Sequence, residues 1–439
     1  MAGERRYIPA SEFCASVRDG THDSPKPVQN GRKLVTSRHL TTGRLDLTDA
    51  YLISEEDFEA INKRSKVDRW DVLISMIGTV GEPCLIKEEP DFAIKNIGLF
   101  KTKSEADGKW LYYYLRSKDA QHSIREQSRG TTQQYIPLGA LRDFPILVAD
   151  DPEEQRAIAA VLGALDDKIE LNRRMNATLE AMARALFQSW FVDFDPVRRN
   201  MDRSGNKSSA LSSEASAKED ALFPDSFQDS ELGPIPTGWE VKTVGDIGNV
   251  ICGKTPPTSV SDYYGDDIPF ITIPDMHGNV FAAATARKLS HAGANSQANK
   301  TLPPGSLCVS CIATPGLVVI TSEDSQTNQQ INSVVPHQKE ETYFWYWVMT
   351  RLGAEIASSG SGGSVLVNLS KGRFETLQII KPPHALIRAY HTTVRPLFEA
   401  ILANTHQSRT LATLRDTLLP KLLSGKLRVS VALLAEDFI

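Results

Sequence analysis

Three short motifs in this chain carry residue types that serve in catalysis or metal binding. Cys308 and Cys311 form a CxxC, but residues three apart in a strand point to opposite faces, and no second cysteine pair completes a zinc site. Residues 90–95 (PDFAIK) resemble part of a nuclease motif but lack the second carboxylate that would hold a metal. Residues 381–384 (KPPH) share two prolines with the Asn-Pro-Pro-aromatic signature of amino-methyltransferases, but lack its amide and its aromatic residue. None of the three motifs is complete.

Other catalytic signatures are missing as well. The chain has no GxGxxG or Walker-type glycine loop, its nine histidines show no HExxH or similar metal spacing, and no serine lies in a GxSxG elbow. We therefore predict no catalytic residues, no bound metal and no cofactor. The alternative, a nuclease or methyltransferase in its own right, would be revealed by activity of the purified chain with metal or methyl donor.

Polar and basic side chains gather instead in glycine- and proline-rich loops, one set in each half of the chain. The net charge of −5 argues weakly against a nucleic-acid partner, but acidic segments elsewhere account for its sign. Lys and Arg in such loops can neutralise phosphates while Ser, Thr, Asn and Gln read base edges. A solvated surface is the alternative for any single one of these cations. If the partner is DNA, loop position and polar chemistry predict as its contacts Lys26, Arg32, Lys33, Ser37, Arg38, Thr79, Arg129, Thr131, Thr132 and Gln133 in the first half, and Lys254, Thr255, Asp275, His277, Thr314, Gln329, Ser361 and Ser364 in the second.

A long helix that occurs twice must position these loops. Residues 153–191 and 385–423 align without gaps at an offset of 232 positions, which pairs Asn172 with Asn404. Apolar residues repeat at heptad spacing, which predicts coiled-coil-like helices of about 38 residues, or about 57 Å at 1.5 Å per residue. The residues predicted to pair the helices are Ile158, Leu162, Leu165, Ile169, Asn172, Leu179, Leu186, Val394, Leu397, Ile401, Asn404, Leu411 and Leu418.

Five residues of this pattern carry further expectations. Asn172 and Asn404 interrupt the apolar stripe at its middle, where a paired polar residue fixes register at some cost in stability. Met175 and Met182 are expected to complete the stripe on the first helix. Pro396 lacks an N–H and predicts a bend or a new start in the second helix. The alternative interpretation is that each segment is simply a core helix of a larger domain.

A looser duplication precedes each helix. The segment DVLISMIGTVGEPCLI from Asp71 corresponds to SLCVSCIATPGLVVI from Ser306, and residues 34–37 correspond to residues 270–273. These segments alternate or run apolar and end in glycine turns, which predicts strands joined by tight loops. A short aromatic helix follows in each half. The order is therefore globular unit, helix, globular unit, helix.

Composition sets the predicted domain boundaries. Residues 1–150 and 231–382 are the two globular units, and residues 151–196 and 383–439 contain the two helices, the second with a C-terminal tail. Residues 197–230 are serine-rich and poor in apolar residues, which predicts a flexible linker. Thirty structureless residues inside one compact domain would be uncommon, so we place the main boundary in this segment.

Composition also bounds the class of protein. A length of 439 residues with 41% apolar content suits several ordinary domains. The absence of an 18-residue apolar run and the polar start MAGERRYIPA predict a cytoplasmic protein without a membrane partner. Five cysteines, an odd number in a large chain, argue against a disulfide framework.

Several segments, taken in order, resemble the specificity subunit of a type I restriction–modification complex. They are DPEEQR at residues 151–156, the helix ALDDKIELNRRMNATLEAMARALFQSWFVDFDP, the second-half CGKTPPT…YYGDDIPFIT, and the closing LRDTLLPKLLSGKL. The resemblance covers essentially the whole chain. Residues 329–331 parallel residues 95–97 only loosely, and Pro315 stands where a small or branched residue is expected.

The resemblance implies an α+β fold in which two tandem α/β target-recognition domains alternate with two long helices, packed as an antiparallel coiled-coil-like rod with a pseudo-two-fold axis. It implies a non-catalytic subunit that binds a bipartite, asymmetric double-stranded DNA target and recruits two methyltransferase (modification) subunits and the restriction/translocase subunits. Antiparallel helices let the two domains face DNA as a dimer would, so helix length sets the spacer between half-sites. A helical scaffold that binds protein rather than DNA is the remaining alternative.

Overall fold

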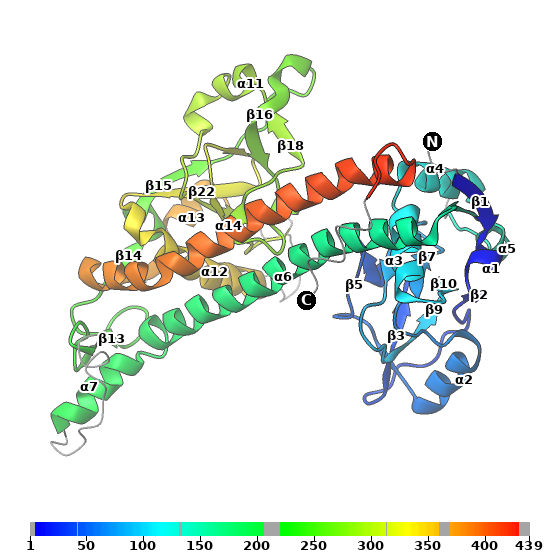
Figure 1. The fold of residues 1–439 in the computed structure, drawn as a ribbon. Helices are drawn as coiled ribbons and strands as arrows, with labels where there is room; N and C mark the ends of the chain where they lie inside the picture. The colour runs from blue at the N-terminus through cyan, green and yellow to red at the C-terminus, as the bar shows by residue number, and fades with distance from the viewer. Residues whose placement is uncertain are drawn as a thin grey trace. The chain divides into compact units, whose positions relative to one another are not determined.

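The chain divides into two compact units that share its two long helices. Unit 1 comprises residues 1–169 and 410–439, and unit 2 comprises residues 170–409. Each unit contains a globular part and a portion of both helices (Figure 1). In the described part of the chain, no helix combines the length and apolarity needed to cross a membrane. The computed structural model describes residues 5–41, 43–130, 134–205, 220–312, 314–359 and 369–429.

The globular part of unit 1 alternates short strands with short helices. In chain order they are β1 (Arg5–Pro9), α1 (Ala10–Phe13), β2 (Ser16–Asp19), β3 (Arg32–Thr36), η1 (Ser37–His39), β4 (Leu40–Thr41), β5 (Arg44–Leu45), β6 (Leu52–Ile53), α2 (Glu55–Ser65), β7 (Val72–Ser75), β8 (Pro83–Leu85), β9 (Phe92–Lys95), β10 (Ile97–Lys101), α3 (Glu105–Leu115), α4 (Lys118–Gln127), α5 (Leu138–Arg142) and β11 (Pro145–Ala149).

Unit 1 is built on an antiparallel sheet in the order β2-β10-β7-β8. A second sheet has the order β6-β3-β9, in which β3 pairs in parallel with β9, and β1 pairs with β11. The aromatic helix α3 is held by Trp110, which is fully buried and whose indole N–H donates to the Leu147 carbonyl (2.7 Å). A buried indole needs such a partner, because an unpaired N–H would cost free energy.

The globular part of unit 2 has a similar order of elements. They are β12 (Phe227–Gln228), β13 (Ile235–Pro236), β14 (Glu240–Thr243), α9 (Val244–Ile247), β15 (Gly248–Cys252), η2 (Ser261–Tyr263), β16 (Tyr264–Ile271), α10 (Ile273–Met276), β17 (Phe281–Ala282), β18 (Arg287–Leu289), α11 (His291–Asn295), η3 (Ala298–Lys300), β19 (Leu307–Ser310), β20 (Val318–Thr321), β21 (Gln326–Thr327), β22 (Ile331–Pro336), η4 (Lys339–Glu341), α12 (Thr342–Ser359), α13 (Lys371–Glu375) and β23 (Gln378–Lys381).

Strand order in unit 2 repeats that of unit 1. Its main sheet has the order β15-β22-β19-β20-β17, so its first four strands correspond to β2, β10, β7 and β8. The parallel pair β16–β21 corresponds to β3–β9, and the pair β14–β23 corresponds to β1–β11. The duplication of globular units that the sequence predicts is therefore present in the topology of each unit.

The two long helices are α6 (Pro152–Phe191) and α14 (His384–Leu423), each of 40 residues. They run antiparallel inside unit 2. Asn176 donates from Nδ2 to the Ile401 carbonyl (3.3 Å), whereas Ala183, further along α6, accepts at its carbonyl from Tyr390, which lies earlier in α14 (3.0 Å). The sequence predicts helices of about this length.

Pro396 does not divide the second helix. The expected break is wrong, because α14 is a single helix from His384 to Leu423. Val394, Phe398 and Ile401 on either side of the proline are at most 2% exposed in the core of unit 2. Apolar burial of this size offsets the hydrogen bond that a proline removes from a helix.

Most residues predicted to pair the helices face inward. Met175 and Met182 do not, because they are 42% and 53% exposed. Asn176 and Ala183, one residue further along, take the inward positions, since the seam advances from Asn172 in alternating steps of about four and three residues. Buried residues of the predicted set are Ile158, Leu162, Asn172, Val394 and Ile401, and half-buried ones are Leu165, Ile169, Leu179, Leu186, Leu397, Asn404, Leu411 and Leu418.

A polar node marks the middle of the helix pair, within unit 2. Asn172 is fully buried and donates from Nδ2 to Gln407 Oε1 (2.8 Å) and Ser408 Oγ (3.2 Å). Asn404 donates from Nδ2 to Asn176 Oδ1 (2.9 Å). In the 232-residue offset, Asn172 corresponds to Asn404 and Asn176 corresponds to Ser408. The same contact is therefore made twice with the helices exchanged, which gives the node an approximate local two-fold symmetry.

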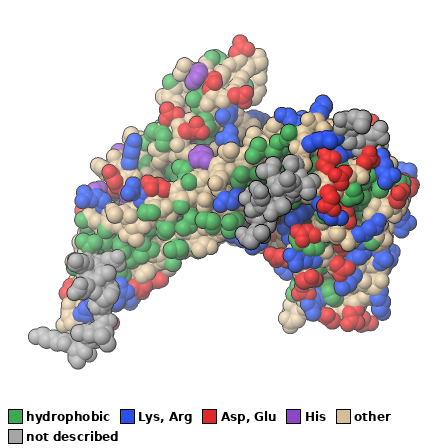
Figure 2. Space-filling view, in the orientation of Figure 1, with side chains coloured by type: hydrophobic (Ala, Val, Ile, Leu, Met, Phe, Trp, Pro, Cys, Tyr) green, Lys and Arg blue, Asp and Glu red, His purple; other side chains and the backbone are tan. Residues whose placement is uncertain are grey.

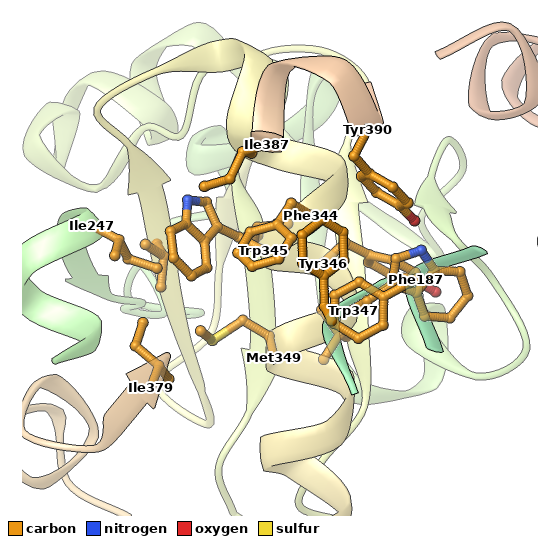
Figure 3. Packing of buried hydrophobic residues seen from close by; sticks show 14 of the residues in the cluster. Phe187, Ile247, Phe344, Trp345, Tyr346, Trp347, Met349, Ile379, Ile387 and Tyr390 are labelled. Carbon is orange, nitrogen blue, oxygen red and sulfur yellow. The ribbon is translucent and has the colours of Figure 1, made fainter. Parts of the chain in front are cut away.

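Aromatic side chains join the helix pair of unit 2 to its globular part. Figure 3 shows Phe187 of α6 and Tyr390 of α14 beside the aromatic run of α12. The Phe187 ring centroid lies 5.7 Å from that of Phe344, 6.3 Å from that of Trp347 and 6.2 Å from that of Tyr390. Such tilted and edge-on pairs add to the free energy of apolar burial.

Charged side chains make the corresponding junction in unit 1. Asp166 of α6 accepts from Arg415 of α14 (2.5 Å) and from the Tyr113 hydroxyl of α3 (2.8 Å). Burial raises the pKa of Tyr113, so the phenol keeps its proton and acts as donor. One half-buried carboxylate thus ties three helices of unit 1 together.

The segment between α6 and the globular part of unit 2 is more ordered at its ends than the sequence predicts. Where residues 197–230 were expected to be a flexible linker, α7 (Asp195–Gly205) is helical and residues 220–230 pack back on it. Asp220 is 1% exposed and accepts from Arg199 (2.8 Å) and Arg203 (2.9 Å). The expectation of a structureless segment is wrong in these parts, because this ion pair organises them. Residues 206–219 lie outside the described residues.

The first strand of unit 1 is clamped to both long helices by one arginine. Arg5 makes a bidentate ion pair with Glu154 (2.9 and 3.1 Å), and their side chains are only 8% and 11% exposed. Arg5 also donates to the carbonyls of Leu423 (3.1 Å) and Leu422 (3.3 Å), which end α14. The guanidinium therefore satisfies carbonyls that have no partner within the helix.

We expect Arg5→Ala to lower the free energy of unfolding by about 3 kcal/mol, because it leaves the buried Glu154 carboxylate unpaired. The matched control is Arg156→Ala, which breaks an exposed pair with Glu153 on the same helix (59% and 55% exposed). It should cost less than about 1 kcal/mol. Urea unfolding followed by circular dichroism measures both, and equal shifts in midpoint would contradict the clamp.

Candidate nucleic-acid interface

A tight loop with the same internal bonds joins two core strands in each unit. In unit 1, Ser75 donates from Oγ to the Thr79 carbonyl and accepts from the Glu82 amide (2.8 Å). In unit 2, Ser310 donates from Oγ to the Thr314 carbonyl (2.5 Å) and accepts from the Leu317 amide (2.9 Å). The serines hold both loops in one shape, which exposes the predicted contact residues Thr79 and Thr314 at their tips.

Each loop ends in a glycine with a positive φ. Gly81 has a φ of +92° and Gly316 a φ of +95°, a backbone conformation that other residues rarely adopt. A Cβ at Gly316 would also lie 2.5 Å from the carbonyl oxygen of Gly353 in helix α12. The glycine turns predicted from the sequence therefore have a structural cause in both units.

A second pair of loops follows β2 and β15 and packs on the neighbouring strands. A Cβ at Gly20 would lie 2.3 Å from the Ile94 carbonyl oxygen, and a Cβ at Gly253 would lie 2.1 Å from the Asn328 carbonyl oxygen. Glycine is required here because the backbones touch. These two glycines give the two units a common reference point for comparing the residues that follow.

In unit 1, His22 lies two residues after Gly20, and its ring contacts the side-chain carboxamide of Asn96. His22 Nδ1 lies 2.9 Å from Asn96 Oδ1, and His22 Nε2 lies 3.0 Å from Asp19 Oδ2. Asp19 is buried and also pairs with Arg64, whereas the His22 side chain is 65% exposed. Ser37, a predicted contact residue, donates from Oγ to the Asn96 carbonyl (3.0 Å). These side chains meet where the parallel strands β3 and β9 end.

In unit 2, Thr255 lies two residues after Gly253, and its hydroxyl contacts the side-chain carboxamide of Gln329. Thr255 donates from Oγ1 to Gln329 Oε1 (2.8 Å), and Gln329 is exposed. The backbone bonds of Gly20 to the Ile97 carbonyl and of Gly253 to the Ile331 carbonyl align the two units. The next amides, of Thr21 and Lys254, donate to the carbonyls of Ile94 and Thr327, respectively. Between these anchors unit 2 has one residue more than unit 1, which explains the loose sequence match of residues 329–331 to residues 95–97.

The predicted cations fall into two groups. Arg32 is neutralised within unit 1, because it pairs with Glu55 (3.0 Å) and Asp91, and these hydrogen bonds raise its pKa. Lys33 donates to the Leu47 carbonyl (3.2 Å), and Arg38 donates to the Asp49 carbonyl (3.1 Å). Arg38 is exposed but also pairs with the Asp49 carboxylate (3.6 Å), whereas Lys26, Arg129 and Lys254 form the second group, which is exposed.

Two further predicted contacts in unit 2 differ in their surroundings. Asp275 has both carboxylate oxygens occupied, since it accepts from the Thr272 amide (2.8 Å) and hydroxyl and from the Ala286 amide (2.8 Å). It therefore caps α10 rather than facing a ligand. His277 follows α10 and is exposed. The predicted contacts Thr131, Thr132, Gln133, Ser361 and Ser364 lie outside the described residues.

An open cleft in unit 2 adds basic residues that the predicted set does not contain. Arg287 and Lys288 of β18 and Arg409 of α14 line it together with Thr258 and Thr285. Lys288 donates to the Asp266 carbonyl (3.1 Å), and Arg409 donates to the Ala283 carbonyl (3.0 Å), so both heads are held at the surface. For Arg409 the sequence offers one signal, a cation in the second helix where the first copy has Ala177.

The structure also adds His22 and Asn96 to the candidate residues. The sequence signal for His22 is its place two residues after the glycine, which matches the place of Thr255. Asn96 has a φ of +54°, which Asn tolerates better than most residues, but no sequence pattern shows this conformation. Their convergence depends on the pairing of strands far apart in the chain.

The CxxC does not form a site. Cys308 of β19 is buried in one apolar cluster, and Cys311, the residue after the end of that strand, is buried in another, so the two thiols face different cores as the sequence predicts. Burial raises the pKa of Cys308 to about 12, so this thiol stays protonated. In the described ranges, no three His, Cys, Asp or Glu residues are placed to hold a metal ion.

Known proteins resemble this chain over most of its length. Its sequence matches the family described as "Type I restriction modification DNA specificity domain" over residues 26–181 and 236–385. It is 37% identical over 335 residues to the type I restriction enzyme HindI specificity subunit of Haemophilus influenzae, which covers 69% of this chain and 73% of that protein. The MjaIX specificity subunit of Methanocaldococcus jannaschii is 30% identical over 335 residues, which covers 73% of this chain and 69% of that protein.

The fold agrees with these sequence matches. A crystal structure of the type I restriction–modification S subunit from M. genitalium matches with a TM-score of 0.54 at 16% identity, and the match covers 96% of each chain. At that identity the match bears on fold alone. The fold, the two family matches and the two curated relatives agree, and the chain belongs to the family of type I restriction–modification DNA specificity subunits.

Proposed function

We propose that the two units of this chain each read one half of a bipartite, asymmetric DNA sequence. In this proposal residues 1–150 and 231–382 are the target-recognition domains, and the chain itself performs no catalysis. It acts in a complex with two methyltransferase subunits and with restriction/translocase subunits. Double-stranded DNA is the ligand of the exposed loops.

One observation carries this proposal. Both units present the same loops on the same strand order, held by Ser75 and Ser310 and by Gly20 and Gly253, but the exposed side chains on those loops differ. A shared frame with different polar side chains is what the reading of two different half-sites requires. A protein-binding scaffold would give no reason for exposed amides, threonines and cations to occupy these equivalent loops.

We expect the chain, co-expressed with its methyltransferase partner, to direct adenine methylation at a single bipartite motif in the host genome. The motif should consist of two specific segments separated by a spacer of fixed length, because one chain carries both units and both include parts of the same two helices. Genome-wide mapping of methylated adenines measures this. A stable complex that methylates no such motif would instead favour the protein-scaffold alternative.

The exposed and the neutralised cations should behave differently in DNA binding. Arg129→Ala should weaken binding of a duplex that carries the mapped site and lower the salt dependence by about one unit in log–log slope, because it removes a phosphate contact. Arg32→Ala is the matched control, since Glu55 and Asp91 already neutralise that charge. Anisotropy titrations of the methyltransferase complex over a series of salt concentrations compare them. A larger slope change for Arg32→Ala would contradict this assignment.

An apolar face of α6 supports a docking site for a methyltransferase subunit. Leu171, Met175 and Met182 are 49%, 42% and 53% exposed in unit 2, and their spacing places them on one face of the helix. Figure 2 shows hydrophobic side chains gathered over this part of α6. Arg173 and Arg184 beside this face pair with glutamates of the same helix (2.6 and 3.5 Å). An apolar helix face with a charged border suits a helix of a protein partner.

We expect Met182→Glu to weaken assembly with the methyltransferase subunit at least tenfold, because it places a charge in an apolar contact. Met201→Glu is the matched control, since Met201 is an exposed methionine too (42%, against 53% for Met182) but lies on α7. Both chains should keep the circular dichroism of the parent. Size-exclusion chromatography and interaction calorimetry with the methyltransferase subunit report assembly, and equal affinities for the two variants would refute this docking face.

A further inference from the structure

We propose that Asn96 in unit 1 and Gln329 in unit 2 occupy equivalent positions and each read the edge of one adenine in the major groove of the half-site. His22 and Thr255 act as positioning residues that orient these amides. The inference rests on the proposed function and specifies the side chains and the base. It adds His22 and Asn96, which the sequence prediction did not contain, to the DNA-facing set.

The chemistry of a carboxamide fits adenine. In the major groove adenine presents an acceptor, N7, beside a donor, the N6 amino group, and an Asn or Gln amide matches both at once. An amide has two N–H donors and an oxygen with two lone pairs. One hydrogen bond to a positioning residue, with either end of the amide, leaves at least one donor and one acceptor. Among the described residues no further side-chain partner of the Asn96 or Gln329 amide is found.

The positioning residues fix the direction of each amide. In unit 1, His22 Nδ1 contacts Asn96 Oδ1 at 2.9 Å, and Asp19 holds the other side of the ring at 3.0 Å. Asp19 itself is 8% exposed at its side chain and pairs with Arg64, so the support behind the ring is buried. In unit 2, the β-branched Thr255 needs no such support, because its side chain has a single rotatable torsion before the hydroxyl.

The main chain of Asn96, a half-buried residue, is fixed by its own contacts. Its φ of +54° is a left-handed conformation, which costs free energy and persists where the surroundings fix it. Ser37 donates to the main-chain carbonyl of Asn96 (3.0 Å), and the main-chain N–H of Asn96 donates to the Thr21 carbonyl (3.1 Å). Both main-chain polar groups are therefore occupied within unit 1, and the carboxamide is the group that remains for a ligand.

The two amides reach equivalent places by different routes. One is Asn on the shorter connection, and the other is Gln on a connection that is one residue longer between the same backbone anchors. Their partners differ too, an imidazole in unit 1 and a hydroxyl in unit 2. Simple inheritance of one loop would have kept its length and residue types. The feature shared by both units is a side-chain carboxamide whose oxygen contacts a neighbouring side chain.

The test maps adenine methylation directed by variants of the chain in complex with its methyltransferase partner. Gln329→Ala should make one adenine position in a single half-site degenerate, with discrimination at that position lowered about tenfold or more. Asn96→Gly should do the same in the other half-site only, and glycine keeps the left-handed backbone of Asn96. Thr255→Val should share the defect of Gln329→Ala, whereas Thr255→Ser should retain the parent motif because it keeps the hydroxyl.

The control is Gln378→Ala, because Gln378 on β23 carries an exposed carboxamide of unit 2 that donates to Glu231 (2.5 Å), and this variant should leave the motif unchanged. A parent chain with a bipartite motif whose Gln329→Ala and Asn96→Gly variants both keep every position would overturn this inference and leave the proposed function standing. Degeneracy at a position without adenine in either strand would overturn the base assignment. A parent chain that directs no bipartite motif would instead overturn the proposed function.

Discussion

The pairing of α6 with α14 in opposite directions is the constraint on which the rest of the structure depends. At its middle, Asn172 is fully buried and its Oδ1 has no partner among the described residues, so the node costs stability. Its Nδ2 donates to Gln407 and Ser408, and a one-residue slip of either helix would lose these bonds while leaving the amide buried. A seam of leucines alone would tolerate such slips at little cost, so the polar node restricts the register.

Two positions of the long helices that correspond between the units hold a charged pair in unit 1 and apolar side chains in unit 2. Asp166 and Arg415 form an ion pair in unit 1, and the residues 232 positions away, Phe398 and Ala183, are both buried in the apolar core of unit 2. Buried ion pairs and apolar packing of similar volume contribute comparable stability, so one contact can change into the other without loss of the fold. This exchange explains how the halves keep one geometry while their sequences share only fragments. The exchanged positions face the cores, so they leave the exposed loops to vary independently.

Local patterns in the sequence predicted the long helices and the turns. Contacts between segments far apart in the chain determine which side chains are buried, paired or exposed. The long helices and the glycine turns follow from period and residue type. Placing the stripe on Met175 and Met182 was wrong by one position, because Asn176 is polar and Ala183 is small, whereas the neighbouring methionines are large and apolar. Arg32 was predicted to be a DNA contact like any other loop cation, because no local pattern shows that Glu55 and Asp91 meet it across strand pairs. The correspondence between Asn96 and Gln329 could not be predicted from the sequence. It depends on the strand register and on the one extra residue in unit 2.

The residues that hold the loops in place are different from the exposed residues on those loops. This separation bears on how the recognised DNA sequence can change. Gly20 and Gly253 touch backbone, and Ser75 and Ser310 hold their loops from inside, so substitution at these positions would disturb the fold. Thr79, Thr314 and Gln329 are exposed, and their side chains can change at little cost in stability. Under the proposed function, sequence preference can therefore shift through a few loop residues while the helices and the register at Asn172 stay as they are. Because each unit has its own loops and its own core, a change in one half-site need not affect the other, and the spacer between half-sites should remain constant through such changes.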